Sequence, residues 1–176
     1  MKKREVEHIL KEIPITGYDE EMQCFTCRGN RNFNIYRVSP KDLVNSDVDE
    51  IEMDCFKWAK FYKTYGQDVG ITTMKFPCDT GEQQHYWRKR LEENKNPLYG
   101  DMIQKKIDEL VYREKHNVTK EFFLFTFFQS KDEIPDAVKV IDSTLGIGRM
   151  GLLEEIQKSK KVQVLFKLGN KNSLIF

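Results

Sequence analysis

The clearest hydrophobic pattern in the chain is the run EFFLFTFF at residues 121–128. Side chains of an extended strand alternate between its two faces, and here apolar groups occupy both alternating sets. A strand that is apolar on both faces is typical of the centre of a sheet covered on both sides. The run therefore predicts a central strand, and a position at the edge of an interface stays open.

Shorter runs predict the other elements. Residues 22–27 and 32–38 are two extended segments joined by a turn at RGN, and residues 69–76 form a β-branched strand that Pro77 closes. Helical spacing predicts helices over 5–13, 48–65, 81–94, 97–116 and 135–145. In the second of these, we expect the inner face to consist of Ile51, Cys55, Trp58, Ala59 and Tyr62.

The residues between 80 and 117 predict a highly charged helical hairpin. Thr80 with Gln83 has the spacing of a capping box, and Asn96 followed by Pro97 is typical of a second helix start. In this second helix we expect the inward positions to be Ile103, Ile107, Leu110 and Val111.

The segment 147–176 is a C-terminal tail of mixed pattern. Residues 162–168 fit a helix and also alternate as a strand; the spacing of Leu152, Ile156, Leu165 and Leu168 favours helix, and strand stays open. The whole order predicts an α+β fold with a mainly antiparallel sheet, a ferredoxin-like core with the charged helical hairpin inserted. We expect one domain over 1–176, with its core at about 22–145.

Composition narrows the class of protein. Lys and Arg number 29 against 28 Asp and Glu, so the net charge predicts neither a nucleic-acid nor a membrane partner. No apolar run approaches the roughly 20 residues that cross a bilayer, and MKKREVEHIL lacks the apolar core of a signal peptide. The simplest interpretation is a cytoplasmic protein whose cysteines are reduced.

The pair Cys24 and Cys27 raises the question of metal or redox chemistry. A structural zinc site normally takes four ligands, and Cys55 and Cys78 would have to converge on the pair to complete one. A redox pair usually opens a helix, whereas MQCFTCR reads as extended. Buried or half-buried thiols are the favoured interpretation, and metal binding stays open.

Other signatures of catalysis are missing from the sequence. GIGRMGLL at 146–153 has glycines but no Lys-Ser/Thr ending, so it predicts a helix end and turn rather than a phosphate-binding loop. The histidines His8, His85 and His116 are scattered over polar helical surfaces. We therefore expect no enzymatic activity and assign no catalytic, cofactor-binding or metal-binding residue.

Basic residues beside aromatics within 86–106 suit single-stranded nucleic acid, although acidic residues alternate with them. Two alternatives to a protein-binding module thus remain. One is a nucleic-acid-binding protein. The other is an enzyme that uses Cys24 and Cys27 with zinc or by thiol exchange.

One stretch carries a family resemblance: the strand ending at Pro77, then DTGEQQ, ENKNP, the charged helix and the KEFF strand. These features resemble the N-terminal, non-motor domain of the conjugative-transfer ATPases of type IV secretion systems, in the versions found in mobile elements of Gram-positive bacteria. The resemblance covers about residues 13–145. The phosphate-binding and magnesium-binding motifs of the family's motor domain are absent, so no catalytic residue is carried over.

The resemblance implies a non-catalytic role in assembling a conjugation apparatus at the inner face of the membrane. The implied partners are other conjugation and secretion proteins, with the transfer ATPase and membrane channel subunits as candidates. Self-association as a homo-oligomer stays open. The alternative function is that of a nucleic-acid-binding accessory protein of the same kind of mobile genetic element. The exposed faces of the hairpin and of the helix at 5–13 are the expected contact surfaces.

Overall fold

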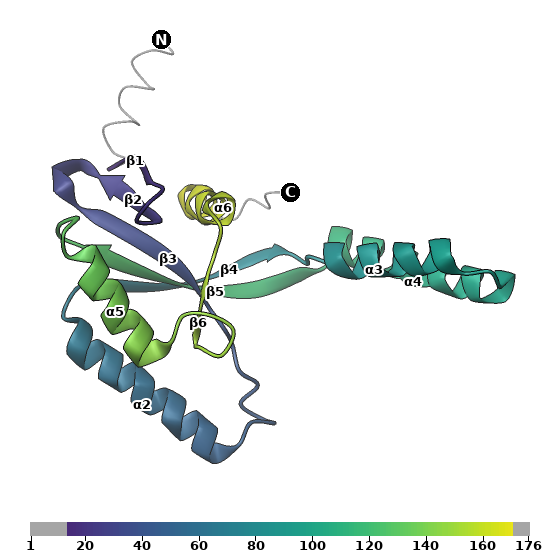
Figure 1. The fold of residues 1–176 in the computed structure, drawn as a ribbon, viewed down its shortest axis with the longest axis horizontal. Helices are drawn as coiled ribbons and strands as arrows, with labels where there is room; N and C mark the ends of the chain where they lie inside the picture. Colours follow the sequence, from purple (N-terminus) through teal and green to yellow (C-terminus); the bar gives the residue numbers. More distant parts are fainter. Residues whose placement is uncertain (1–13, 171–176) are drawn as a thin grey trace, which may run out of the picture. The chain divides into compact units, whose positions relative to one another are not determined.

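The computed structural model describes residues 14–170, so the helix expected at 5–13 lies outside the described part. The strands are β1 (Ile15–Asp19), β2 (Cys24–Cys27), β3 (Asn32–Val38), β4 (Val69–Pro77), β5 (Val118–Phe128) and β6 (Leu153–Glu155). The helices are α2 (Val48–Tyr65), α3 (Gly81–Glu93), α4 (Pro97–His116), α5 (Ile134–Leu145) and α6 (Lys158–Gly169), with a short 3-10 turn, η1 (Arg28–Asn30), between β2 and β3 (Figure 1).

The strands form one sheet in the order β1-β2-β3-β5-β4, and β6 pairs with β3. β3 runs antiparallel to β5, from Asn32 opposite Phe128 to Val38 opposite Phe122. The elements from β3 to β6 follow the order β-α-β-β-α-β, and the spatial order β6-β3-β5-β4 is that of a ferredoxin-like core. The predicted α+β fold with a mainly antiparallel sheet is confirmed, and the helical hairpin stands between β4 and β5.

One face of the sheet is covered by α2 and α5 (Figure 1). Leu124 of β5 lies in the resulting core with Phe61 and Tyr65 of α2 and with Ile141 and Leu145 of α5. In the sheet, β5 lies between β3 and β4, so the predicted central strand is confirmed. Burying these side chains supplies the main favourable free energy of folding, about 1.5–3 kcal/mol for each fully buried large apolar side chain.

The inner face of α2 differs from the prediction. Trp58 is half-buried as expected, but Cys55, Ala59 and Tyr62 are exposed, and Phe61 and Tyr65 are buried instead. Both sets have helical spacing, so periodicity alone cannot choose between them. The Tyr65 hydroxyl donates to the carbonyl of Phe127 at 2.9 Å, a contact with β5 that fixes which stripe turns inward.

An aromatic ladder crosses the first strands of the sheet. Tyr18 of β1 meets Phe25 of β2 edge-on, and Phe25 stacks on Phe33 of β3, each with ring centroids 5.0 Å apart. Phe33 in turn stacks on Phe125 of β5 at 6.4 Å. Such cross-strand aromatic pairs contribute about 0.5–1.5 kcal/mol each beyond their buried area, so they hold the N-terminal hairpin on the sheet.

Two strands were missed by the sequence patterns. Residues 15–19 form β1, and residues 153–155 form β6 in a stretch where helix was expected. β1 pairs with β2 and β6 pairs with β3. The hydrogen bonds of this pairing stabilise both strands, and local sequence patterns do not indicate them. Residues 162–168 lie within α6, which confirms the helical interpretation.

The glycines at 146–151 make a turn, as predicted. Gly146 has a φ of 76° and follows α5, and its carbonyl accepts from the amide of Leu153 at 3.1 Å. A Cβ at Gly151 would lie 2.2 Å from the Gly146 oxygen, so the two segments approach more closely than any side chain permits. This close approach brings β6 back to the sheet immediately after α5.

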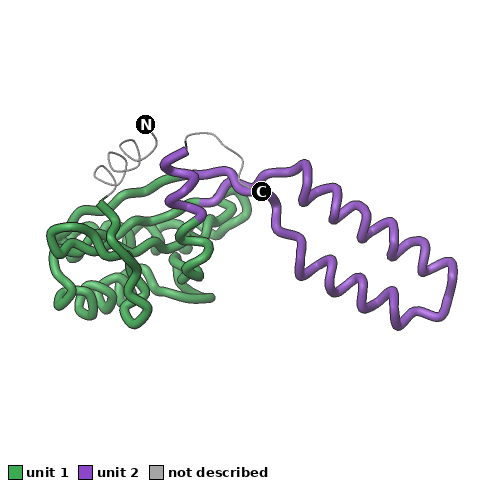
Figure 2. Tube along the Cα trace, turned by 90° about the horizontal axis from the view of Figure 1, so that it is seen from above, with its two compact units in different colours: residues 1–72, 122–162 green, residues 73–121, 163–176 purple. Residues whose placement is uncertain are grey.

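The chain separates into two compact units (Figure 2). The described part of the first unit comprises residues 14–72 and 122–162, and that of the second comprises residues 73–121 and 163–170. The second unit contains the helical hairpin, which runs from α3 to α4 within the predicted limits of 80–117. No helix within residues 14–170 is long and apolar enough to cross a bilayer.

Candidate interaction site

Local side-chain contacts shape the tip of the helical hairpin. Asn96 caps α4, because its side-chain oxygen accepts from the amide of Leu98 at 3.1 Å, and Pro97 occupies the first turn as predicted. The side chain of Asn94 bridges the same turn, accepting from the Asn96 amide at 3.1 Å and donating to the Asn96 carbonyl at 2.6 Å. The three-residue connection between the helices is therefore held by its own amide groups.

The base of the hairpin is held by a buried polar cluster. The hydroxyl of Thr80 donates to the carbonyl of Leu110 at 3.1 Å and accepts from the Gln84 side-chain amide at 2.9 Å. Gln84 also donates to the Glu114 carboxylate. Thr80 and Gln84 are 4% and 7% exposed, so these bonds form away from water, where an unpaired group would be costly.

This cluster corrects one detail of the sequence analysis. Thr80 does occupy the N-cap position of α3, but its side chain makes no capping hydrogen bond. The hydroxyl is turned toward α4 instead, and the carboxylate of Asp79 accepts from the amide of Gly81 at 3.0 Å. The predicted capping box is therefore wrong, because the tertiary contact with α4 outcompetes the local one.

The inner face of α4 is as predicted. Ile107 and Leu110 are buried, and Ile103 and Val111 are half-buried. On α3, Trp87 and Leu91 are half-buried. The apolar contact between the two helices thus fixes their relative position independently of the polar cluster at the base.

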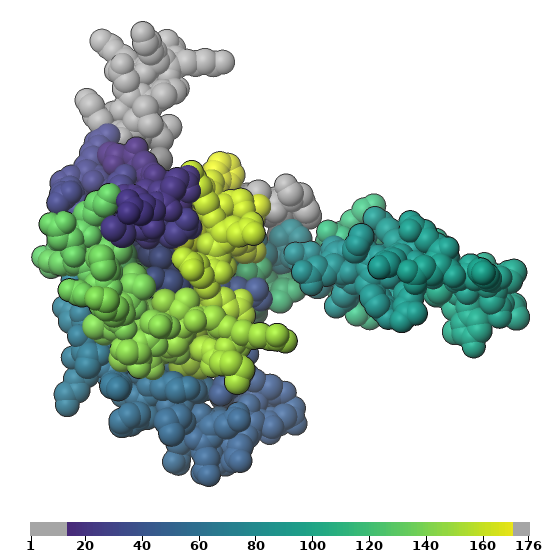
Figure 3. Space-filling model, in the orientation of Figure 1, coloured from purple at the N-terminus to yellow at the C-terminus, as the bar shows by residue number. Residues whose placement is uncertain are grey.

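A groove of about 740 Å³ lies along one face of the hairpin. Five residues of α3 and its following turn line it together with four residues of α4: Tyr86, Trp87, Arg90, Glu93, Asn94, Tyr99, Met102, Ile103 and Lys106. Figure 3 shows the hairpin in space-filling form, coloured teal. The groove belongs to the second unit alone.

The groove exposes large apolar groups to solvent. Tyr86, Tyr99 and Met102 are 51%, 59% and 67% exposed, respectively. Aromatic residues and Met are enriched where proteins bind one another. Aromatic rings supply rigid contact area at little conformational cost, and the flexible Met side chain adapts to the shape of a partner. A concave surface of this composition is suited to binding another molecule.

The charges at the rim of the groove are of mixed sign. Arg90 lies over the ring of Tyr86, with 5.5 Å from the guanidinium carbon to the ring centroid, and its Nε donates to the Tyr86 hydroxyl at 3.2 Å. Lys106 pairs with Glu109 at 2.9 Å. Glu93 makes no ion pair with another residue of the described chain and is exposed. The Tyr86 hydrogen bond and, more weakly, the nearby charge of Glu93 raise the pKa of Arg90, so the rim carries cations and a carboxylate side by side.

The structure places the cysteine pair on a strand. Cys24 and Cys27 are the two ends of β2, and both are free thiols, Cys24 buried and Cys27 half-buried. Burial raises the pKa of the Cys24 thiol to about 11, which keeps it protonated and unreactive at neutral pH. Among residues 14–170, no group of three or more His, Cys, Asp or Glu side chains is placed to hold a metal ion.

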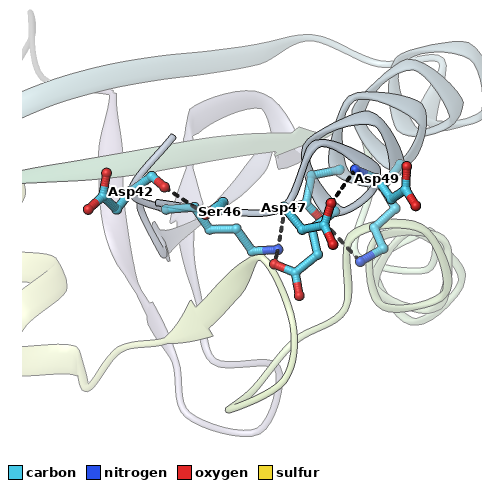
Figure 4. A network of polar contacts seen from close by, with 8 residues as sticks. Asp42, Ser46, Asp47 and Asp49 are labelled. Atoms are coloured by element: carbon cyan, nitrogen blue, oxygen red, sulfur yellow. Dashed lines mark hydrogen bonds and ion pairs between the residues drawn. The ribbon is translucent and has the colours of Figure 1, made fainter. Parts of the chain in front are cut away.

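The segment before α2 carries a second polar cluster (Figure 4). Asp47 caps the helix by accepting from the amide of Asp49 at 3.2 Å, and the Ser46 hydroxyl donates to the carbonyl of Asp42 at 2.6 Å. Lys41 pairs with Asp54 at 2.7 Å. Each of these contacts fixes the start of α2, so the cluster is explained by local structure.

One charged side chain is buried at a position that the sequence pattern did not indicate. Lys161 of α6 is fully buried, and its Nζ donates to the carbonyl of Gln23 at 2.7 Å. Burial lowers the pKa of this amine. The signal in the sequence is weak, since Lys161 stands in the basic run KSKK; only its helical spacing to the buried Val164 marks an inward position. Its contact explains how α6 is anchored to the β1–β2 segment.

The comparisons with known proteins add one relative. No protein-family model and no solved structure matches the chain. A Bacillus anthracis protein described as uncharacterized, pXO2-10, is 22% identical over 158 residues, which cover 81% of this chain and 70% of that protein. Its name assigns that relative to the plasmid pXO2, so the chain has a plasmid-encoded homologue.

Proposed function

We propose that the chain is a non-catalytic assembly module of a conjugative DNA-transfer apparatus of the type IV secretion kind. It binds its partner through the groove between α3 and α4. The observation that carries the proposal is that groove, in which aromatic and Met side chains stay open on a hairpin held at both ends by hydrogen bonds. A preorganised surface loses little conformational entropy when it binds, so more of the contact energy appears as affinity.

The sequence supports the same assignment. The segment that resembles the N-terminal domain of conjugative-transfer ATPases includes the whole hairpin, 80–117. The plasmid-encoded relative is consistent with a mobile genetic element. The candidate partners are the transfer ATPase, the membrane channel subunits and a second copy of this chain, and the site would lie on the cytoplasmic side through those partners.

The groove supplies enough apolar surface for specific binding. Covering a large apolar side chain contributes about 1.5–3 kcal/mol when its exposed area is removed from water completely. Tyr86, Tyr99 and Met102 are half or more exposed, so a partner that covers all three gains a substantial part of that amount from each. The charged rim then sets which partner fits.

Mating experiments with the mobile element test the proposal. Met102→Asp places a charge in the groove at an exposed position, so folding stays intact and the transfer frequency is expected to fall by about tenfold or more. Leu98→Asp is the matched control, because Leu98 is 78% exposed on the same helix outside the groove. Equal transfer by wild type, Met102→Asp and a Tyr99→Asp variant would refute the proposal.

Binding to single-stranded nucleic acid is the second candidate. It is favoured by one feature, the stacking of Arg90 on Tyr86 at the rim of an aromatic groove, since bases stack on such platforms. The neighbouring acidic residues oppose it, because Lys106 and Arg113 both pair with Glu109. The hairpin as a whole lacks a continuous basic track for phosphates.

Fluorescence anisotropy with a labelled single-stranded oligonucleotide decides between the two candidates. Nucleic-acid binding predicts an affinity that falls steeply with salt and is lost in an Arg90→Glu variant. A protein-binding groove predicts no change in anisotropy even at low salt.

A further inference from the structure

We infer that the occupant of the groove is the helical hairpin of a second copy of this chain, docked antiparallel. The inference rests on the proposed function, since it names the partner of the same groove. It is carried by the distribution of charge along the groove and by the overall charge balance of the hairpin.

The groove has two distinguishable ends. Along α3 it runs from Tyr86 to Glu93, and along α4 it runs back from Tyr99 to Lys106. Each row spans eight residues, a rise of about 10 Å along the helix at about 1.5 Å per step. The end near the base therefore carries Tyr86 and the cation of Lys106, whereas the end near the tip carries Tyr99 and the carboxylate of Glu93.

Antiparallel docking makes these ends complementary. A two-fold axis across the middle of the groove places the tip end of one copy over the base end of the other. Glu93 of each copy then lies at the end of the joint groove where the second copy has Lys106, and the two-fold repeats this pairing. Parallel docking would instead bring the Glu93 carboxylates of the two copies to the same end, where they repel.

The charge of the hairpin as a whole also favours a copy of itself. Residues 80–117 contain eight basic and seven acidic side chains, interspersed along both helices. A surface so nearly neutral offers little attraction to a polyanion or to a strongly charged protein, yet it brings two copies together without net repulsion. Two antiparallel hairpins with an apolar seam form a four-helix arrangement, a packing that is stable in many proteins.

The mass of the purified full chain, measured by sedimentation velocity at about 1–500 µM, tests the inference. We expect a reversible monomer–dimer equilibrium in the wild type. Glu93→Lys and Lys106→Glu should each raise the dimer dissociation constant by about tenfold, because the two-fold axis repeats each like-charge contact. The double variant, in which the opposite charges face each other again, should return to within about threefold of wild type.

Neighbouring residues provide matched controls. Glu92→Lys and Lys105→Glu make the same charge changes on exposed residues of the same helices that do not line the groove, and they should leave the dimer unchanged. Circular dichroism of every variant establishes that helix content is retained. A monomeric wild type over the whole range, single variants equal to their controls, or a double variant without recovery would each overturn the inference.

The same variants separate this inference from the proposed function. A monomeric wild type whose transfer frequency still falls with Met102→Asp means that the groove binds another protein, so only the dimer is wrong. A charge-dependent dimer without any effect of Met102→Asp on transfer means that self-association is right and the proposed role in conjugation is wrong.

Discussion

The hydroxyl of Thr80 donates a hydrogen bond to the carbonyl of Leu110 at 3.1 Å, and this bond ties the start of α3 to the last turns of α4. The amide of Cys78 also donates to the carbonyl of Asn117 at 3.1 Å, so the two chain segments are joined again just below the helices. The groove near the tip thus stands on a base that is fixed by main-chain and side-chain contacts together.

Replacing Thr80 by Val should loosen this base. The substitution keeps the shape but leaves the Leu110 carbonyl and the Gln84 amide short of a buried partner, at a cost of about 1–3 kcal/mol. Urea denaturation should show this loss in the free energy of unfolding. Thr80→Ser keeps the hydroxyl and should be about as stable as wild type. A Thr80→Val variant as stable as wild type would show that the bond contributes nothing.

Replacing Asn96 by Ala should fray the first turn of α4. The variant removes the acceptor of the Leu98 amide, and N-cap losses cost about 0.5–2 kcal/mol. Hydrogen exchange at the amides of residues 98–100 should accelerate, while the amides of Ile107 and Leu110 stay protected. Asn96→Asp, which retains a capping oxygen, serves as the control, and unaltered exchange in Asn96→Ala would contradict the assigned cap.

Gly151→Ala should be among the most destabilising single changes in the chain. Its added Cβ would lie 2.2 Å from the main-chain oxygen of Gly146, so the turn that positions β6 must shift. Gly70→Ala is the control, because a Cβ there meets the Cβ of Phe125 at an ordinary 3.6 Å. Thermal denaturation should show that the free energy of unfolding falls by at least about 2 kcal/mol in Gly151→Ala but not in Gly70→Ala. Equal midpoints would mean that the turn has room to relax.

The cysteines should react with iodoacetamide in a defined order. Cys55 is exposed, whereas Cys24 is buried and burial raises its thiol pKa to about 11. Since the thiolate is the reactive form, mass spectrometry at about pH 8 should find Cys55 alkylated first and Cys24 last, after unfolding. Early modification of Cys24 in the folded protein would contradict its position in the core.

Stability should decline at alkaline pH. Burial raises the pKa of the Cys24 thiol from 9.0 to about 11 and that of the Tyr36 phenol from 10.0 to about 12. At a pH between the ordinary and the raised pKa of a group, the group is deprotonated in the unfolded chain but still protonated in the folded chain. The free energy of unfolding therefore falls as the pH rises through this interval. Urea denaturation between about pH 8 and pH 11 should show this fall. In Cys24→Val, the free energy of unfolding should fall less at the lower end of this pH range, because the variant has no thiol to titrate there. A constant free energy of unfolding over the range would contradict the burial of both groups.

The sequence by itself determined the elements whose signals are local. Helix α2 ends at Gly66 because glycine adopts its φ of 68° without strain, and α4 begins at Asn96-Pro97 because that pair caps a helix. The apolar residues on both faces of 121–128 predicted a central strand. Basic residues beside aromatics in 86–106 indicated a candidate surface for single-stranded nucleic acid on the hairpin, although acidic residues alternate with them.

Only the tertiary structure decided the rest, because those features depend on residues far apart in the chain. β1 and β6 are strands through pairing with β2 and β3. The inner stripe of α2 was selected by the contact of Tyr65 with Phe127, and the hydroxyl of Thr80 turned to Leu110 instead of capping its own helix. The groove exists because two helices bring residues 86–94 and 99–106 onto one face, an arrangement that helical periodicity in either segment alone does not specify.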